Sequence, residues 1–328
     1  MARMRILSGM RPSGKLHIGH LLGALANWKR LQDEGAETYY MVADWHALTT
    51  EYMKSETVQS NISEMVLDWL AAGLDPEKSV IFVQSHVKEH AELYLLFSMI
   101  TPLGWLERVP TYKEALEEYK DREIATHGFL GYPLLQAADI LVYKADGVPV
   151  GQDQLPHLEF TRELARRFHH LFSEVFPEPQ SLLTQTPLIR GIDGRKMSKR
   201  YGNAILLSDT EEDTRKKVMQ MMTDPARKRR SDPGNPDVCP VFDLQKIFGA
   251  PEWVARVNRE CRTAEIGCVE DKQALADSLN GALRPFRTRR AELASDPQGV
   301  KRILTDGAQR ARATAAATMS EVRKAIHI

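Results

Sequence analysis

The sequence has few cysteines, no long apolar run and no excess of either charge. Its three cysteines are an odd number, which fits a reducing compartment better than a disulfide scaffold. There is no run of about 18 apolar residues, so we expect no membrane-spanning helix. Lys plus Arg and Asp plus Glu are 44 each, so a nucleic-acid partner needs a local basic face on a neutral molecule.

Repeats and low-complexity tracts are also lacking, and the first residues read as a strand rather than as the apolar core of a signal peptide. Apolar residues make up 43% of the 328 residues and charged residues 27%, which is typical of a globular protein with room for two domains. We therefore expect a cytoplasmic globular protein.

What the chain does have is an alternation of short apolar runs and helical patterns. This alternation predicts an α/β domain with a doubly wound parallel sheet of the Rossmann-like kind, which binds ligands at the carboxyl ends of its strands. From about residue 207 the pattern is mainly helical. We expect a nucleotide-binding domain over 1–205, with an insertion and dimer contact at about 101–131, followed by a helical domain over 206–328. The strand patterns lie at 4–7, 38–43, 79–84 and 148–150, and the helical patterns at 17–33, 56–72, 88–100 and 155–172.

The stretch from Leu7 to His20, LSGMRPSGKLHIGH, reads as a strand, a glycine-bearing turn and the start of a helix. The first N–H groups of a helix lack intrahelical partners, which makes such a turn suitable for phosphate. His17 and His20 are three residues apart and so lie on one face of the first turn. This pattern predicts a nucleotide site; the alternative is that the two histidines only cap and pack the turn.

A second motif, KMSKR at 196–200, is flanked by Gly191, Gly194 and Gly202. Glycines favour a mobile loop, and two lysines on it suit stabilisation of the charge of a triphosphate and a leaving pyrophosphate. The alternative is a solvated run of charges.

Two further polar features interrupt apolar surroundings. The GQDQ sequence at 151–154 follows a short strand, where its side chains suit ribose hydroxyls or an amino group, or form only a polar turn. Asp139 lies within LLQAADILV, and a buried carboxylate needs a partner. That partner is either a ligand N–H or an internal tyrosine or backbone group.

Together these motifs resemble the class I aminoacyl-tRNA synthetases and, within them, the tryptophanyl-tRNA synthetases of bacterial type. His17-Ile18-Gly19-His20 is a full match to the HIGH signature, and 196–200 matches KMSKS except for Arg200 in place of serine. The blocks ADWHALT, YPLLQAADIL and VPVGQDQ extend the resemblance over essentially the whole chain. Tyrosyl enzymes share most blocks but typically carry a tyrosine where this chain has Leu7, an apolar wall that suits an indole.

The resemblance implies activation of L-tryptophan with ATP and Mg²⁺, transfer to the 3′ end of tRNA(Trp), and a homodimer. It implies catalytic roles for His17, His20, Lys196 and Lys199. The implied tryptophan-binding residues are Asp139, Gln154, Tyr132, Gln136 and Leu7; many bacterial members have methionine at the position of Gln136. The implied ATP-binding residues are Arg11, Pro12, Ser13, Gly19, His20, Gly151, Gln152, Asp153, Leu188, Lys196, Met197, Ser198, Lys199 and Arg200.

Three other functions stay open at this point. One is tyrosine specificity. Another is an adenylyltransferase with a small acceptor, a group that usually lacks a second helical domain. The last is an auxiliary paralogue that binds tRNA or protein without charging, against which the intact HIGH motif argues.

The cysteines allow two interpretations. Some bacterial members of the resembled family hold an iron–sulfur cluster with four cysteines, the last three spaced C-x6-C-x2-C. Here Cys261 and Cys268 keep the spacing and Cys239 lies upstream, but the fourth position is Asp271. Carboxylate is a poor ligand for this soft site, so we favour three thiols without a cluster over an aspartate-completed cluster.

The run Arg227-Lys228-Arg229-Arg230 is the densest basic segment of the helical part. It is either solvated surface or, beside a tRNA-charging site, a contact for RNA phosphates.

Overall fold

The computed structural model describes residues 3–109, 112, 124–183 and 189–328. They form two compact units, each described here by itself. The sheet unit comprises residues 1–14, 27–185 and 296–328, and the helical unit comprises residues 15–26 and 186–295.

Five parallel strands form the sheet, in the order β3-β2-β1-β4-β5. Leu7 lies opposite Tyr39, and Tyr39 opposite Val80. The strand order reverses between β1 and β4, the switch point at which such folds bind ligands, and this confirms the predicted doubly wound sheet. The short edge strand β5 was not predicted. The strands are β1 (Arg5–Met10), β2 (Glu37–Val42), β3 (Ser79–Val83), β4 (Gly147–Val150) and β5 (Gln180–Leu183).

One face of the sheet is covered by α2 (Ala26–Asp33) and α4 (Val58–Ala71). The ring of Tyr40 on β2 stacks on Trp28 at a centroid distance of 4.6 Å, and Trp28 meets Trp69 edge-on at 5.0 Å. Successive side chains of a strand point to opposite faces, so Tyr39 belongs to the other face. There its ring stacks on Tyr143 at 4.8 Å.

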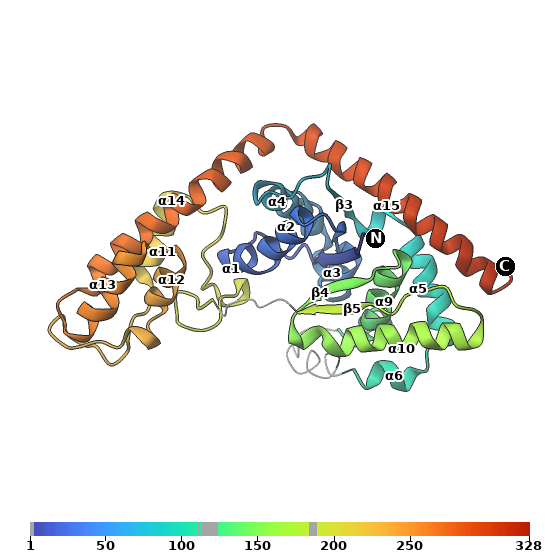
Figure 1. The fold of residues 1–328 in the computed structure, drawn as a ribbon, viewed down its shortest axis with the longest axis horizontal. Helices are drawn as coiled ribbons and strands as arrows, with labels where there is room; N and C mark the ends of the chain where they lie inside the picture. The colour runs from blue at the N-terminus through green and yellow to red at the C-terminus, as the bar shows by residue number, and fades with distance from the viewer. Residues whose placement is uncertain (1–2, 110–111, 113–123, 184–188) are drawn as a thin grey trace. The chain divides into compact units, whose positions relative to one another are not determined.

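That second face holds the main hydrophobic core, which includes Phe82, Phe97 and Phe168. Four helices supply it: α5 (Glu89–Ile100), α9 (Tyr132–Val142), α10 (Leu155–Leu171) and α15 (Pro297–Ala325) (Figure 1). Shorter helices complete the unit: α3 (Asp44–Glu51), which was not predicted, α6 (Leu103–Glu107) and α8 (His127–Leu130).

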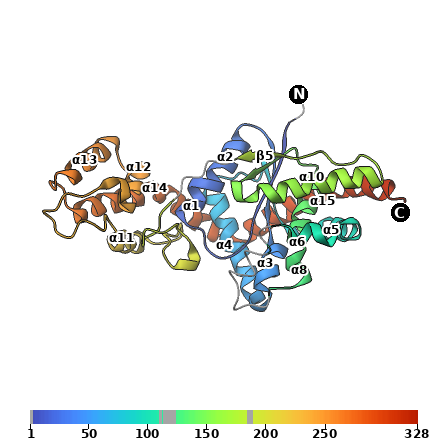
Figure 2. The same ribbon diagram turned by 90° about the horizontal axis from the view of Figure 1, so that it is seen from below.

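The helical unit is built around α14 (Cys268–Ala294), whose Leu275, Leu279 and Leu283 are buried. α11 (Glu211–Gln220) and α12 (Pro240–Phe248) pack on it, and α13 (Pro251–Arg262) packs on α12 (Figure 2). The unit also contains the start of the HIGH helix, α1 (Ile18–His20), which continues through a π-helical turn at Leu21–Leu25 into α2.

The two units do not follow the single boundary between residues 205 and 206 that the sequence pattern predicts. Helix α15 belongs to the sheet unit because Ala311, Ala315 and Met319 are fully buried in its core. Residues 15–26 belong to the helical unit, where the Ile18 amide donates to the Ile205 carbonyl at 3.1 Å. Helical periodicity indicates that these segments are helices but not which surface they cover.

Among the described residues, no helix has both the length and the apolar character that a membrane crossing requires.

Candidate active site

The two histidines of the HIGH motif cap the helix that follows them. The Nδ1 atom of His17 accepts from the Gly19 amide at 3.1 Å, and the His17 amide donates to Nδ1 of His20 at 3.2 Å. A Cβ on Gly19 would lie 2.9 Å from the His17 ring, so only glycine fits between them. The two histidines therefore do cap the helix, as the simpler alternative predicts. Capping uses only the Nδ1 atom of each ring.

Both rings are held neutral. Burial, and then the charge of Lys199, lower the pKa of His17 to about 4. Burial, followed by the nearby His17 and Lys199, lowers the pKa of His20 to about 3. Because each Nδ1 accepts a hydrogen bond, the single ring proton of each neutral histidine lies on Nε2. Both residues can therefore donate an Nε2–H to an anionic ligand without carrying charge.

A short antiparallel contact brings the two signature motifs together although they are far apart in sequence. His17 pairs with Leu206, and the Leu207 amide donates to the Leu16 carbonyl at 2.9 Å. The segment after KMSKR is thereby fixed beside HIGH within the helical unit, which explains the effect of Lys199 on both histidines.

The KMSKR segment follows a tight turn. At this turn the backbones of Arg190 and Lys196 form an isolated antiparallel β-bridge. Asn203, almost fully buried, holds this turn: its Oδ1 accepts from the Ser198 amide at 2.8 Å, and its Nδ2 donates to Asp193 at 2.7 Å and to the Lys196 carbonyl at 3.2 Å. Met197 is buried, whereas Lys196 and Arg200 are exposed. The buried methionine anchors the segment and leaves the charged side chains on its surface.

In the sheet unit, a pocket of about 360 Å³ opens at the carboxyl end of β1, next to the switch point. All five residues predicted to bind tryptophan line it: Leu7, Tyr132, Gln136, Asp139 and Gln154. Arg11 and Gly151, predicted to contact ATP, line it as well. The volume is in the range of small-molecule sites.

Asp139 has internal partners, but not the tyrosine or backbone group considered above. Its carboxylate is 2% exposed and accepts from His46 Nε2 and His90 Nδ1, both at 2.7 Å. Gln84 Nε2 donates to both oxygens, at 2.8 and 2.9 Å. Burial alone would raise the pKa of Asp139, but the charges of and hydrogen bonds from His46 and His90 outweigh it and lower the pKa. Asp139 is therefore held as a carboxylate.

In the neutral tautomer that donates its Nε2–H to Asp139, His46 offers a second acceptor in the same pocket. Its Nε2 faces Asp139, and its buried Nδ1 has no hydrogen-bond partner among the described residues. Gln136 accepts from His157 Nδ1 at 2.8 Å, which turns its amide oxygen toward α10. Leu7, Met41 and Ile140 supply apolar wall.

The remaining predicted ATP contacts are divided between the two units. Pro12, Ser13, Gln152 and Asp153 belong to the sheet unit, whereas Gly19, His20 and residues 196–200 belong to the helical unit. Leu188 lies outside the described residues, as do residues 110–111 and 113–123 of the insertion expected at 101–131.

Sequence reasoning missed four residues that hold this machinery in place: Gln84, His46, His90 and Asn203. The first three lie in α3, α5 or the turn after β3 and meet Asp139 only through the fold. His46 follows a strand within ADWHALT, which is the one signal by which it could have been found.

A parallel sheet with a polar pocket at its switch point, together with HIGH and KMSKR motifs held side by side, defines a class I aminoacyl-tRNA synthetase. Residues 1–284 match the family model described as tRNA synthetases class I (W and Y). The chain belongs to this family.

Curated relatives extend the match over the whole length. The tryptophan–tRNA ligase of Thermotoga maritima is 54% identical over 326 residues, 99% of each chain. That of Deinococcus radiodurans is 45% identical over 98% of each chain. Among solved structures, the tryptophanyl-tRNA synthetase of Campylobacter jejuni, complexed with ADP and tryptophan, superposes with a TM-score of 0.91 at 32% identity, covering 99% of this chain and 100% of that one.

Proposed function

We propose that this chain is an aminoacyl-tRNA ligase that activates L-tryptophan with ATP and transfers it to the 3′ end of tRNA(Trp). The observation that carries the choice of amino acid is the pocket at the switch point, which joins an apolar wall at Leu7 to the buried acceptor Asp139. An indole has one N–H and is otherwise apolar. A tyrosine phenol is both donor and acceptor, so Asp139 could accept its O–H, but leucine at position 7 gives its oxygen no donor.

Asp139 is proposed to accept the indole N–H. Both of its oxygens already accept hydrogen bonds, so Gln84 has to release one of its two bonds when the indole enters. The unpaired Nδ1 of His46 is the alternative acceptor in this pocket. Tyr132 and Gln154, which also line the pocket, are proposed to hold the amino and carboxylate end of the substrate.

Adenylate formation needs no enzyme nucleophile. A carboxylate oxygen of tryptophan bonds to the α-phosphorus of ATP, and the bond from that phosphorus to the bridging oxygen of pyrophosphate breaks. His17 and His20 are proposed to donate their Nε2–H groups to the phosphates, and Lys196 and Lys199 to stabilise the charge on the departing pyrophosphate. Magnesium is proposed to bind with ATP, through phosphate oxygens and water.

The other predicted ATP contacts keep their proposed places. Gly151, Gln152 and Asp153 border ribose and adenine, and Arg11, Pro12, Ser13 and Gly19 approach the phosphates. Leu188, which is outside the described residues, is proposed to contact adenine, and Met197 and Ser198 are proposed to shape the KMSKR segment. Arg200 is assigned no specific contact with ATP.

The basic loop is proposed to contact tRNA through two of its four side chains. Arg230 is exposed, but its guanidinium donates to the Glu265 carbonyl at 2.7 Å, and half-buried Arg227 donates to the Ile266 carbonyl at 2.9 Å. Lys228 and Arg229 are exposed, and no ion pair or hydrogen bond of their side chains is found in the described part of the chain. These two charges are available for phosphate, and the surrounding helical unit is proposed to read the anticodon.

A homodimer in the cytoplasm is the proposed assembly. Leu95 and Met99, four residues apart on α5, and Leu103 on α6 are 54%, 70% and 68% exposed. Exposed apolar side chains of this kind suit a partner subunit, and Leu103 itself lies within the insertion at 101–131 that is expected to form the dimer contact.

The deciding experiment is exchange of labelled pyrophosphate into ATP with each amino acid in turn. Exchange with tryptophan alone supports the proposal, and exchange with tyrosine would retain the mechanism but overturn the specificity. Silence with every amino acid would favour a non-charging paralogue. The variant His20→Ala should lose exchange while keeping tRNA binding, and full exchange in this variant would refute the phosphate role of the HIGH motif.

A further inference from the structure

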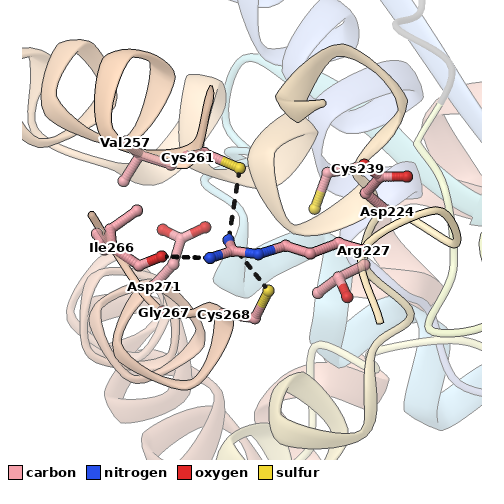
Figure 3. A pocket seen from close by; sticks show the side chains of 10 residues that line it. Asp224, Arg227, Cys239, Val257, Cys261, Ile266, Gly267, Cys268 and Asp271 are labelled. Carbon is pink, nitrogen blue, oxygen red and sulfur yellow. Dashed lines mark hydrogen bonds between the residues drawn. The ribbon is translucent and has the colours of Figure 1, made fainter. Parts of the chain in front are cut away.

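The three cysteines line one small pocket of the helical unit (Figure 3). Cys239 precedes α12, Cys261 lies near the end of α13, and Cys268 is the first residue of α14. All three are free thiols. The enclosed space measures about 20 Å³, which holds about one water molecule.

The space between the sulfurs is occupied by the side chain of Arg227. Its Nη1 lies 3.8 Å from Cys261 Sγ and 3.7 Å from Cys268 Sγ (Figure 3). Its Nη2 donates to the carbonyls of Arg230, at 2.8 Å, and Ile266, at 2.9 Å. One guanidinium thus joins its own loop to the connection between α13 and α14.

Asp271, at the position of the fourth cluster cysteine, has its own partners. Its Oδ1 accepts from Gln245 Nε2 at 2.8 Å and from Trp253 Nε1 at 3.3 Å. The carboxylate therefore ties α14 to α12 and α13. No group of three His, Cys, Asp or Glu side chains suited to a metal is found in the described part of the chain.

We infer that Arg227 closes this thiol pocket and that the chain binds no iron–sulfur cluster in it, the guanidinium acting in place of a cluster as the link between loop and helices. A cubane cluster is normally held by four thiolates and needs room for eight iron and sulfide atoms. Three thiols around a guanidinium, with the fourth ligand position already hydrogen-bonded and room for about one water, do not fit it.

The inference makes Arg227 a positioning residue for the loop 224–236. The Gly234 amide donates to the Cys261 carbonyl at 2.9 Å, and a Cβ on Gly234 would lie 2.8 Å from Cys261 Sγ and 3.1 Å from Arg227 Cδ. The loop backbone therefore approaches the pocket closely where Arg227 crosses it. Removing the guanidinium should release this segment.

The first test is metal content. The full-length chain is purified without oxygen from iron-replete cells and also treated with ferrous iron and sulfide. We expect substoichiometric iron and sulfide and no visible absorption band after either procedure. About three or four iron atoms per chain with matching sulfide, lost in Cys261→Ser, would overturn the inference.

The second test measures the structural role of Arg227 independently of metal content. Arg227→Gln should lower the thermal midpoint by about 2–6 °C and speed amide exchange in residues 228–236, because two carbonyls lose their donor. Arg229→Gln, the matched control on an exposed side chain, should change neither. Cys261→Ser should leave the midpoint nearly unchanged, since sulfur is a weak acceptor. An unchanged Arg227→Gln, or a Cys261→Ser that unfolds, contradicts the inference.

Discussion

At the scale of single residues, the HIGH histidines divide two tasks between the two nitrogens of each ring. Nδ1 of His17 and of His20 accepts a backbone N–H and so fixes the first helical turn. Burial beside Lys199 keeps both rings neutral, which leaves each Nε2–H as a donor. A residue that merely caps the helix would need only the first acceptor, so the proposed phosphate contact of the second nitrogen would account for histidine rather than Ser or Asn at residue 17.

The lowered histidine pKa values predict a pH dependence of stability. In the unfolded chain histidine binds a proton below about pH 6.5, whereas folded His17 and His20 stay neutral down to about 4 and 3. The unfolded state binds more protons in this window, so the free energy of unfolding should fall as the pH is lowered through it.

Urea unfolding at about pH 7.5 and about pH 5 measures this decline. His17→Asn keeps a capping acceptor for the Gly19 amide but removes one titrating group, and it should show a shallower decline than the wild type. An equally steep decline in the variant would mean that His17 already titrates normally in the folded protein.

Asp139→Asn should weaken tryptophan binding more than ATP binding. The amide offers one acceptor and presents an NH₂ group to His46, His90 or Gln84, which leaves buried donors unpaired. We expect kcat/KM for tryptophan to fall by about 100-fold or more, with KM for ATP within about threefold. Gln84→Met removes both hydrogen bonds from Gln84 to Asp139 but keeps the charge, so its effect should be smaller. Equal losses for both substrates would point to collapse of the site instead.

At this scale, the sequence predicts the residues of the motifs but not the residues that hydrogen-bond to them. Leu7, Tyr132, Gln136, Asp139 and Gln154 were identified through a resemblance, and one pocket gathers them all. His46, His90 and Gln84 were not, because they meet Asp139 across 93, 49 and 55 residues of chain. Such partners are set by tertiary packing, which local pattern does not contain.

At the scale of elements, the KMSKR segment is a turn held by one buried amide, Asn203. Asn203→Ala removes the acceptor of the Ser198 amide and the donor to Asp193. We expect pyrophosphate exchange to slow by about 10-fold or more, with KM for tryptophan nearly unchanged, because the lysines lose their fixed backbone. Arg200→Ser, which restores the usual residue of the signature, is the control and should keep exchange within about threefold. A larger loss in the control would assign Arg200 a contact of its own.

Helix α15 crosses the edge strand β3 at a glycine. A Cβ on Gly307 would lie 1.8 Å from the Ile81 carbonyl oxygen, so Gly307→Ala has to push the helix off the strand. We expect a loss of about 1–3 kcal/mol in the free energy of unfolding. Gly281→Ala, a glycine inside α14 with nothing within 4 Å of its Cβ, should instead stabilise by about 0.5–1 kcal/mol. Chemical denaturation of both variants tests the pair, and a stabilised Gly307→Ala would show that α15 is not seated on β3.

At the scale of the whole molecule, each of the two compact units is built from more than one segment of the chain. A pattern of apolar periodicity reports element type and order, and it predicted the parallel sheet and the helical region correctly. It could not show that residues 297–325 return to the sheet, because the small buried residues Gly307, Ala311 and Ala315 read as an ordinary helix. Nor could it show that Leu16 to Ile18 pair with Ile205 to Leu207, since a short bridge has no sequence period.

The balance of charge also belongs to this scale. With a formal net charge of +0, the chain has no general attraction for RNA, so binding has to come from local cations. Lys228→Ala and Arg229→Ala should each weaken tRNA binding, reduce the slope of log affinity against log salt by about 0.7–0.9, and leave tryptophan-dependent pyrophosphate exchange intact. Lys78→Ala also removes one positive charge. Lys78 immediately precedes β3, at the amino ends of the strands, whereas the pocket lies at their carboxyl ends, so this variant should leave the slope unchanged. Filter binding over a range of salt measures all three. If Lys78→Ala lowers affinity as much as the loop variants do, net charge rather than the loop controls tRNA binding.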